Sequence, residues 1–192
     1  MNQANQGANR ACLELLQVAA RDRVLEIGPG NGAFVADIVA SAKHVSYTGL
    51  DWSAEMVDVA GRHNQTLVQR GQATFLQGSS YALPFGRASF DKVLSVHTLY
   101  FWEDPERHLN EIRRVMKPGG LFCLAFGDRA FMQTLPFVAH GFSLYDLPRA
   151  ERILRASGFD VLVQRQLQET GHSNTGDVVK KIINIIVAIA RA

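Results

Sequence analysis

The chain has 192 residues, of which 47% are hydrophobic and 20% are charged. This is the composition of an ordinary globular protein, and the length predicts a single domain over residues 1–192 with a well-buried core. The formal charge of +2 comes from interspersed basic and acidic residues, which excludes the long-range positive field on which nucleic-acid-binding proteins depend.

Helices and strands alternate along the first two thirds of the chain. Short apolar runs predict five strands, over residues 23–27, 45–50, 73–76, 90–96 and 121–126. Helical spacing of apolar residues predicts helices over residues 9–20, 33–42, 53–60 with Ser53 as N-cap, and 105–116. Gly119 and Gly120 are expected to end the last of these helices and to turn the chain into the fifth strand. This alternation is typical of a parallel sheet with helices on both faces.

The last third of the chain follows a different pattern. Residues 127–145 fit neither period and are expected to form a flap over the strand ends, before a helix over 146–157. Two β-rich runs, 159–167 and 178–189, flank the turn-rich GHSNTGD and must pair antiparallel. The prediction is an α/β fold: a doubly wound, mainly parallel seven-stranded sheet with helices on both faces and a C-terminal antiparallel strand.

Cysteine content and the two ends of the chain limit its environment. Cys12 and Cys123 are the only cysteines, and both fall in apolar patterns typical of inert buried thiols, so we expect neither disulfide nor metal. The polar start lacks the features of a signal peptide, and the apolar segment 178–192 contains two lysines and is too short to cross a membrane. We therefore expect a cytoplasmic protein with neither nucleic acid nor membrane as a partner.

The segment VLEIGPGNG joins the first strand to a helix and contains Gly28, Gly30 and Gly32. Glycines at the carboxyl end of the first strand let a ligand approach the backbone closely. Gly28, Gly30 and Ala33 also fit the dinucleotide fingerprint GxGxxG/A, with Asp51 about 20 residues further on to bind a ribose, so a nicotinamide dinucleotide is an open alternative. Glu26 would repel a pyrophosphate but suits a ligand with an ammonium or sulfonium group; the alternative is that it only caps the loop.

Four segments, in the correct order, resemble the successive motifs of the class I S-adenosylmethionine-dependent methyltransferases: VLEIGPGNG, the acid of LDWSAEMV, ALPFGRASFDKVLS and EIRRVMKPGG. The resemblance covers about residues 10–126. It implies the Rossmann-like methyltransferase fold, S-adenosylmethionine as cofactor and S-adenosylhomocysteine as product. It also implies that the glycine loop lies against the methionine part, with Glu26 toward its amino group, that Asp51 binds the ribose hydroxyls, and that Trp52 and Met56 pack near the adenine.

One segment departs from the family pattern. Members often carry an acid after the third strand, where it meets the adenine amino group, but here the segment reads GSSYALPF. Ser79 stands where the acid would be. We therefore expect Ser79 and Ser80 to contact the adenine through weaker, uncharged hydrogen bonds.

The methyl acceptor is expected beside SVHTLYFW, which resembles the family loop on the methionine and substrate side. In-line methyl transfer requires alignment but no protein nucleophile. His97 is the candidate catalytic base if the acceptor is a hydroxyl or an acidic carbon, and is otherwise a hydrogen-bonded wall residue. Acceptor-binding candidates are His97, Tyr100, Trp102 and, in the flap, Tyr145, with His140 as a weaker one; ordinary core aromatics are the alternative for Tyr100 and Trp102.

These observations together predict a methyltransferase for a small-molecule acceptor, as a monomer or homodimer. Two alternatives stay open. One is an NAD(P)-dependent oxidoreductase, in which the glycine loop holds a pyrophosphate at the helix N-terminus. The other is a non-catalytic S-adenosylmethionine-binding partner protein.

Overall fold

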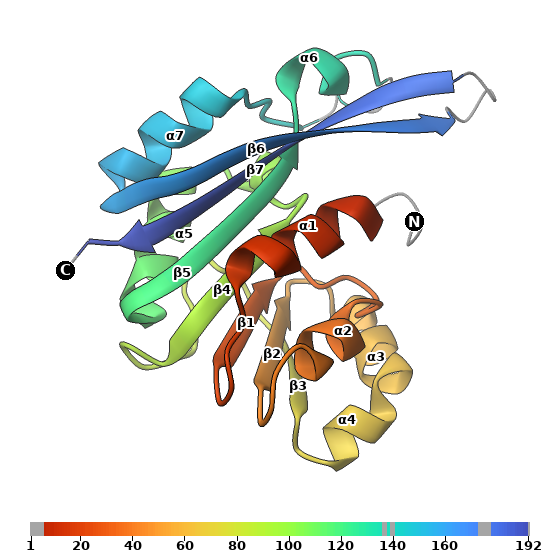
Figure 1. Ribbon diagram of the computed structural model, residues 1–192, viewed down its shortest axis with the longest axis vertical. Helices are drawn as coiled ribbons and strands as arrows, with labels where there is room; N and C mark the ends of the chain where they lie inside the picture. The colour runs from red at the N-terminus through yellow and green to blue at the C-terminus, as the bar shows by residue number, and fades with distance from the viewer. Residues whose placement is uncertain (1–5, 136–137, 139–140, 173–177, 192) are drawn as a thin grey trace.

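Seven strands form one sheet in the order β3-β2-β1-β4-β5-β7-β6 in a computed structural model that describes residues 6–135, 138, 141–172 and 178–191 (Figure 1). The strands are β1 Arg23–Ile27, β2 Ser46–Asp51, β3 Ala73–Gln77, β4 Phe90–Val96, β5 Met116–Gly127, β6 Phe159–His172 and β7 Val178–Ala190. β1 to β5 are parallel, whereas β7 is antiparallel to both β5 and β6. The predicted doubly wound sheet with an antiparallel C-terminal strand is thus confirmed.

Helices cover both faces of this sheet. They are α1 Gln6–Leu16, α2 Val35–Ala40, α3 Ala54–His63, α4 Gln65–Gln69, the short 3-10 helix η2 Leu99–Phe101, α5 Pro105–Val115, α6 Arg129–Met132 and α7 Leu147–Ala156. α1 and α2 pack on one face of the sheet, and α5 and α7 pack on the other (Figure 1). Each face therefore has its own apolar cluster, and the central strands β1 and β4 contribute apolar side chains to both.

Side-chain caps fix where several helices begin. Ser53 Oγ accepts a hydrogen bond from Met56 N at 3.3 Å, which confirms the predicted N-cap of α3. Asp104 and Asp146 cap α5 and α7 in the same way. Such caps satisfy backbone donors that have no partner inside the helix.

The KPGG segment is a correction to the sequence prediction, because it lies within β5 and does not end a helix. α5 ends at Val115, and Met116 already pairs with Phe90; the ladder then shifts register before it resumes at Leu121. Lys117 Nζ bonds both carboxylate oxygens of Asp91, at 2.8 and 2.9 Å. A Cβ on Gly120 would lie 2.8 Å from the Asp91 carbonyl oxygen, so glycine here permits the close approach of the two strands.

The C-terminal hairpin is longer than its sequence pattern predicts. β6 continues to His172, with Glu169 opposite Lys181, and β7 continues to Ala190. Residues 173–177 of the turn and the flap residue His140 lie outside the described residues. None of the helices in the described part of the chain has the length and apolarity needed to cross a bilayer.

Candidate active site

The strand order reverses between β1 and β4, and the residues that follow these strands meet at the carboxyl edge of the sheet. Open α/β sheets bind their ligands at this point. The glycine loop follows β1, Asp51 ends β2 and His97 follows β4. The structure therefore brings the glycine loop, Asp51 and His97 to one edge.

Asp51 organises the start of this site. Its Oδ2 accepts a hydrogen bond from Gly30 N at 3.1 Å, and its Oδ1 accepts one from Ser53 N at 3.0 Å. The side chain is buried. A carboxylate has about four acceptor positions, which is more than these two bonds use.

The three glycines of the loop all have left-handed backbone conformations, but their surroundings differ. A Cβ on Gly28 would meet Thr98 Cγ2 at 2.5 Å, and one on Gly32 would meet Asn64 Nδ2 at 2.6 Å, so these two glycines permit close packing within the protein. A Cβ on Gly30 would have nothing within 4 Å. Gly30, beside Asp51, is therefore the position where the loop lies next to open space.

Glu26 lies beneath the loop and is bonded inside the protein. Its Oε2 accepts a hydrogen bond from Tyr47 OH at 2.6 Å, and the side chain is 5% exposed. Burial raises the pKa of Glu26 to about 7, with a smaller raising effect from the charge of Asp51, while the Tyr47 hydrogen bond acts in the opposite direction. Two acids near the base of one loop favour a cation there over a second anion.

The residues predicted near the adenine differ in how far their side chains are exposed. Trp52 is 82% exposed, directly after Asp51, and Met56 is half-buried. Ser79 is exposed, and its Oγ accepts from Tyr81 N at 3.1 Å. Ser80 is buried, and its Oγ is bonded to His108 Nδ1 at 2.7 Å. Of the two serines, only Ser79 presents its hydroxyl to the outside.

The predicted acceptor residues fall into two groups. His97 Nδ1 lies 2.9 Å from Tyr100 OH, and this hydroxyl also accepts a hydrogen bond from Gly127 N. Burial, and secondarily the charge of Lys181, lowers the pKa of His97 to about 4, so the imidazole is neutral at pH 7. Trp102 stacks on His108 within the α5-side core, and Tyr145 is also buried there, beneath Arg149.

Residues of α5 that the sequence analysis did not select hold the loop between β3 and β4. Arg114 donates to the carbonyl oxygens of Leu83 and Phe85 at 2.9 and 2.7 Å, and Glu111 Oε2 accepts from Leu83 N at 2.8 Å. Arg114 and Glu111 also pair with each other at 2.7 Å. These contacts join residues about 30 positions apart, for which the sequence offers no local signal.

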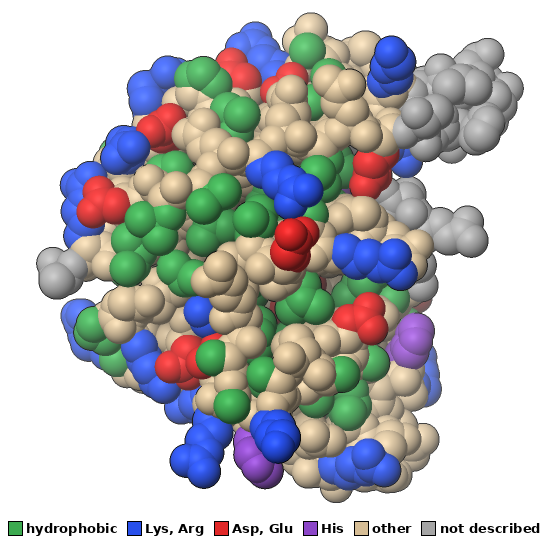
Figure 2. Space-filling model, in the orientation of Figure 1, with side chains coloured by type: hydrophobic (Ala, Val, Ile, Leu, Met, Phe, Trp, Pro, Cys, Tyr) green, Lys and Arg blue, Asp and Glu red, His purple; other side chains and the backbone are tan. Residues whose placement is uncertain are grey.

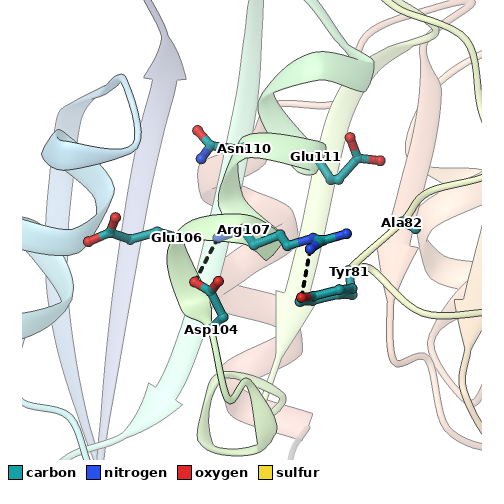
Figure 3. Close-up of a pocket in the computed structure, with 7 residues that line it drawn as sticks. All are labelled: Tyr81, Ala82, Asp104, Glu106, Arg107, Asn110 and Glu111. Carbon is teal, nitrogen blue, oxygen red and sulfur yellow. Dashed lines mark hydrogen bonds between the residues drawn. The ribbon is translucent and has the colours of Figure 1, made fainter.

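A surface hollow of about 480 Å³ lies between this loop and the start of α5 (Figure 3). The Arg107 side chain extends across it from α5, with its guanidinium 3.6 Å from the centre of the Tyr81 ring. Asp104, Glu106 and Glu111 add acidic groups around it. Figure 2 shows acidic and basic side chains interspersed over the visible face of the molecule, without a large area of one sign.

The known proteins to which this chain is similar in sequence are described as methyltransferases. Residues 25–124 match the model of a methyltransferase domain. A fatty-acid O-methyltransferase of Mycolicibacterium smegmatis is 30% identical over 146 residues, which are 76% of this chain and 46% of that protein. The uncharacterized methyltransferase YdaC of Bacillus subtilis is 31% identical over 125 residues, 65% of this chain and 67% of that protein.

A structural likeness agrees with these sequence matches. The methyltransferase partner of the Haloferax volcanii Trm112 activator superposes with a TM-score of 0.86 at 22% identity, over 100% of this chain and 92% of that one. At this identity the likeness concerns the fold alone. The chain spans about half the length of the M. smegmatis relative.

Proposed function

The chain belongs to the class I S-adenosylmethionine-dependent methyltransferase family, and from this premise we propose that it transfers a methyl group to an oxygen atom of a small-molecule acceptor. S-adenosylmethionine is the cofactor of this family. The oxygen acceptor is the finer part of the proposal and is supported by the relative from M. smegmatis, which is named for O-methylation of fatty acids.

One arrangement carries the proposal: the carboxylate of Asp51, bonded to Gly30 N, beside the open space over that glycine. A carboxylate at this place suits the hydroxyls of a ribose, which donate hydrogen bonds. The acids Glu26 and Asp51 suit the ammonium and sulfonium groups of S-adenosylmethionine, whereas a pyrophosphate would meet repulsion at the same place. The residues present therefore fit this cofactor better than a nicotinamide dinucleotide.

Each part of the site then has a proposed task. Asp51 holds the ribose, the exposed Trp52 ring and Met56 pack against the adenine, and the Ser79 hydroxyl bonds its edge. Glu26 is already bonded to Tyr47, so it acts on the ammonium through its charge rather than as a free hydrogen-bond acceptor. Bound S-adenosylmethionine supplies a methyl group on a positively charged sulfur, which an acceptor attacks in line.

Calorimetric titration tests this proposal, with S-adenosylhomocysteine, NADH and NADPH as separate ligands. We expect micromolar binding of S-adenosylhomocysteine alone. The variant Asp51→Ala should bind it at least about 100-fold more weakly, because it loses two hydrogen bonds to a charged acceptor and each contributes roughly 1.5–3 kcal/mol. Asp58→Asn, which changes an exposed acid on α3, is the matched control and should bind normally.

Three results would contradict the proposal. Binding of a dinucleotide alone would make the chain an oxidoreductase candidate. If Asp51→Ala bound S-adenosylhomocysteine with unchanged affinity, the ribose would not be bound by Asp51 at the end of β2. Tight binding of S-adenosylhomocysteine without methyl transfer to any hydroxyl or carboxylic acid offered would favour the non-catalytic partner protein.

A further inference from the structure

We infer that His97 is a hydrogen-bond donor to the methyl acceptor through its Nε2–H, that Tyr100 fixes this tautomer, and that the acceptor oxygen is a carboxylate. This deepens the proposed function and rests on it, because it concerns the acceptor side of the same site. It differs from the base role predicted for His97 from the sequence.

The direction of two hydrogen bonds carries the first step. Gly127 N can only donate, so Tyr100 OH accepts from it. The phenol has a single proton, and the hydroxyl is buried. Within the described part of the chain, the acceptor available to that proton is His97 Nδ1, at 2.9 Å. Tyr100 therefore donates to Nδ1.

This assignment fixes the proton of the imidazole. A neutral imidazole that accepts at Nδ1 carries its proton on Nε2. The ring is neutral because burial lowers the pKa of His97, and Tyr100 keeps its proton because burial raises the pKa of the phenol. Among the described residues, His97 Nε2 has no hydrogen-bond partner, so its N–H is available to a ligand.

The backbone holds the ring in this place. His97 has φ of +59°, a left-handed conformation that non-glycine residues adopt uncommonly. Its N–H bonds the Ala125 carbonyl oxygen of β5 at 2.8 Å. The His97 and Tyr100 rings lie 6.2 Å apart and 20° from parallel. Strand β5 thus positions both partners of the pair.

The chemistry of transfer then selects the acceptor. A hydroxyl oxygen that bonds to the methyl carbon must give up its proton to a base, and Nε2 in this tautomer has no lone pair to receive it. A carboxylate is ionised at pH 7, so it would lose no proton when its oxygen bonds to the methyl carbon, while the S–CH₃ bond breaks and its electron pair stays on the sulfur of S-adenosylhomocysteine. It needs a donor to orient it, and the positive charge of Lys181 near His97 favours an anion.

Nitrogen-15 NMR of the imidazoles tests the tautomer without any substrate. The expected spectrum of the wild-type protein at pH 7 assigns His97 as neutral with the proton on Nε2, and Tyr100→Phe should show the Nδ1–H form in addition. His108, whose Nδ1 faces Ser80, is the internal comparison and should not change in this variant. A wild-type His97 protonated on Nδ1, or on both nitrogens, would overturn the inference.

Kinetics of two substitutions test the donor role. Gln places an amide N–H near the position of Nε2 but cannot take up a proton. His97→Ala should lower kcat/KM for carboxylic acids by about 10- to 100-fold, and His97→Gln should recover at least about tenfold of that loss. Equal losses in both variants, or transfer to phenols but not to carboxylic acids, would overturn the donor role.

Cofactor binding separates this inference from the proposed function. S-adenosylhomocysteine should bind His97→Gln and Tyr100→Phe as it binds the wild-type protein. If the wild-type protein does not bind it, the proposed function fails, and the NMR result still decides the tautomer.

Discussion

At the scale of single residues, Glu26 places a carboxylate where ionisation is unfavourable. Burial raises its pKa from an ordinary 4.5 to about 7, so between these values the folded protein holds a proton that the unfolded chain has released. The stability contributed by this group is complete below pH 4.5 and is lost as the pH rises through 7. Its negative charge above that pH is the property that the proposed ammonium contact uses.

The substitution Glu26→Gln tests how the ionisation of this buried carboxyl affects the stability of the protein. The amide cannot ionise, and its carbonyl oxygen can still accept from Tyr47. At pH 8 the free energy of unfolding should exceed that of the wild-type protein by about 3 kcal/mol, while at pH 5 the difference should be below about 1 kcal/mol. Urea denaturation at both pH values measures this difference, and Glu55→Gln on the surface of α3 is the control. A gap of the same size at both pH values would contradict the assignment.

At the scale of elements, one face of α5 determines where the loop between β3 and β4 lies. Arg107, His108, Glu111 and Arg114 all contact this loop, and their spacing places them along one side of the helix. The same loop carries Ser79, the predicted adenine contact. The position of the adenine end of the site therefore depends on a helix that does not touch the cofactor in our proposal.

Removal of the central arginine tests this dependence. Arg114→Ala leaves the Leu83 and Phe85 carbonyl oxygens without this donor and Glu111 without its ion-pair partner, which should lower the free energy of unfolding by about 2 kcal/mol. Affinity for S-adenosylhomocysteine should also fall. Arg152→Ala, on the exposed side of α7, should change stability by no more than about 0.5 kcal/mol in the same thermal and calorimetric measurements. If the two variants had the same stability and the same affinity for S-adenosylhomocysteine, the position of the loop between β3 and β4 would not depend on Arg114.

The elements also show where sequence reasoning succeeds. β4 has the predicted bounds, and the Ser53 cap of α3 is present, because both follow from local pattern and local hydrogen bonding. The prediction that KPGG ends a helix is wrong, because the chain around it pairs with β4, about 25 residues earlier in the sequence. A local turn pattern carries no information about such a pairing.

Some residues of the candidate site can likewise be predicted from local motifs, whereas others depend on contacts between distant parts of the chain. The glycine loop and Asp51 could be selected from the sequence, since each motif is contiguous and follows a strand. The orientation of His97 could not, because it depends on Gly127 at the end of another strand. The contact of Ser80 with His108 is equally non-local. The roles assigned to these residues stay predictions until the binding and kinetic experiments are made.

At the scale of the whole molecule, a buried amide connects the C-terminal hairpin to the segment after β5. Asn184 is fully buried on β7; its Oδ1 accepts from Gln166 of β6 at 3.0 Å, and its Nδ2 donates to Asp128 at 2.8 Å. Asp128 in turn caps α6, accepting from Ala130 N at 2.9 Å. Strands added at the edge of the sheet thereby fix the segment that borders the proposed acceptor side.

Asn184→Leu tests the connection with a side chain of the same branched shape and the same number of heavy atoms. Asp128 and Gln166 would lose their partner, so the free energy of unfolding should fall by about 1–3 kcal/mol. Ile185→Val, at the neighbouring buried position, is a packing control expected to cost about 1 kcal/mol. Urea denaturation compares the two, and methyl transfer should decline only in Asn184→Leu. A variant as stable and as active as the wild-type protein would show that the hairpin and this segment are independent.

The two tryptophans occupy opposite environments, Trp102 at 4% exposure in the core and Trp52 at 82% beside Asp51. Their fluorescence therefore differs in wavelength and in access to dissolved quenchers, with Trp102 as a constant background. The unlabelled protein carries an optical reporter at the edge of its own proposed cofactor site. Libraries of acceptors can be screened for changes at that edge before the product of any reaction is known.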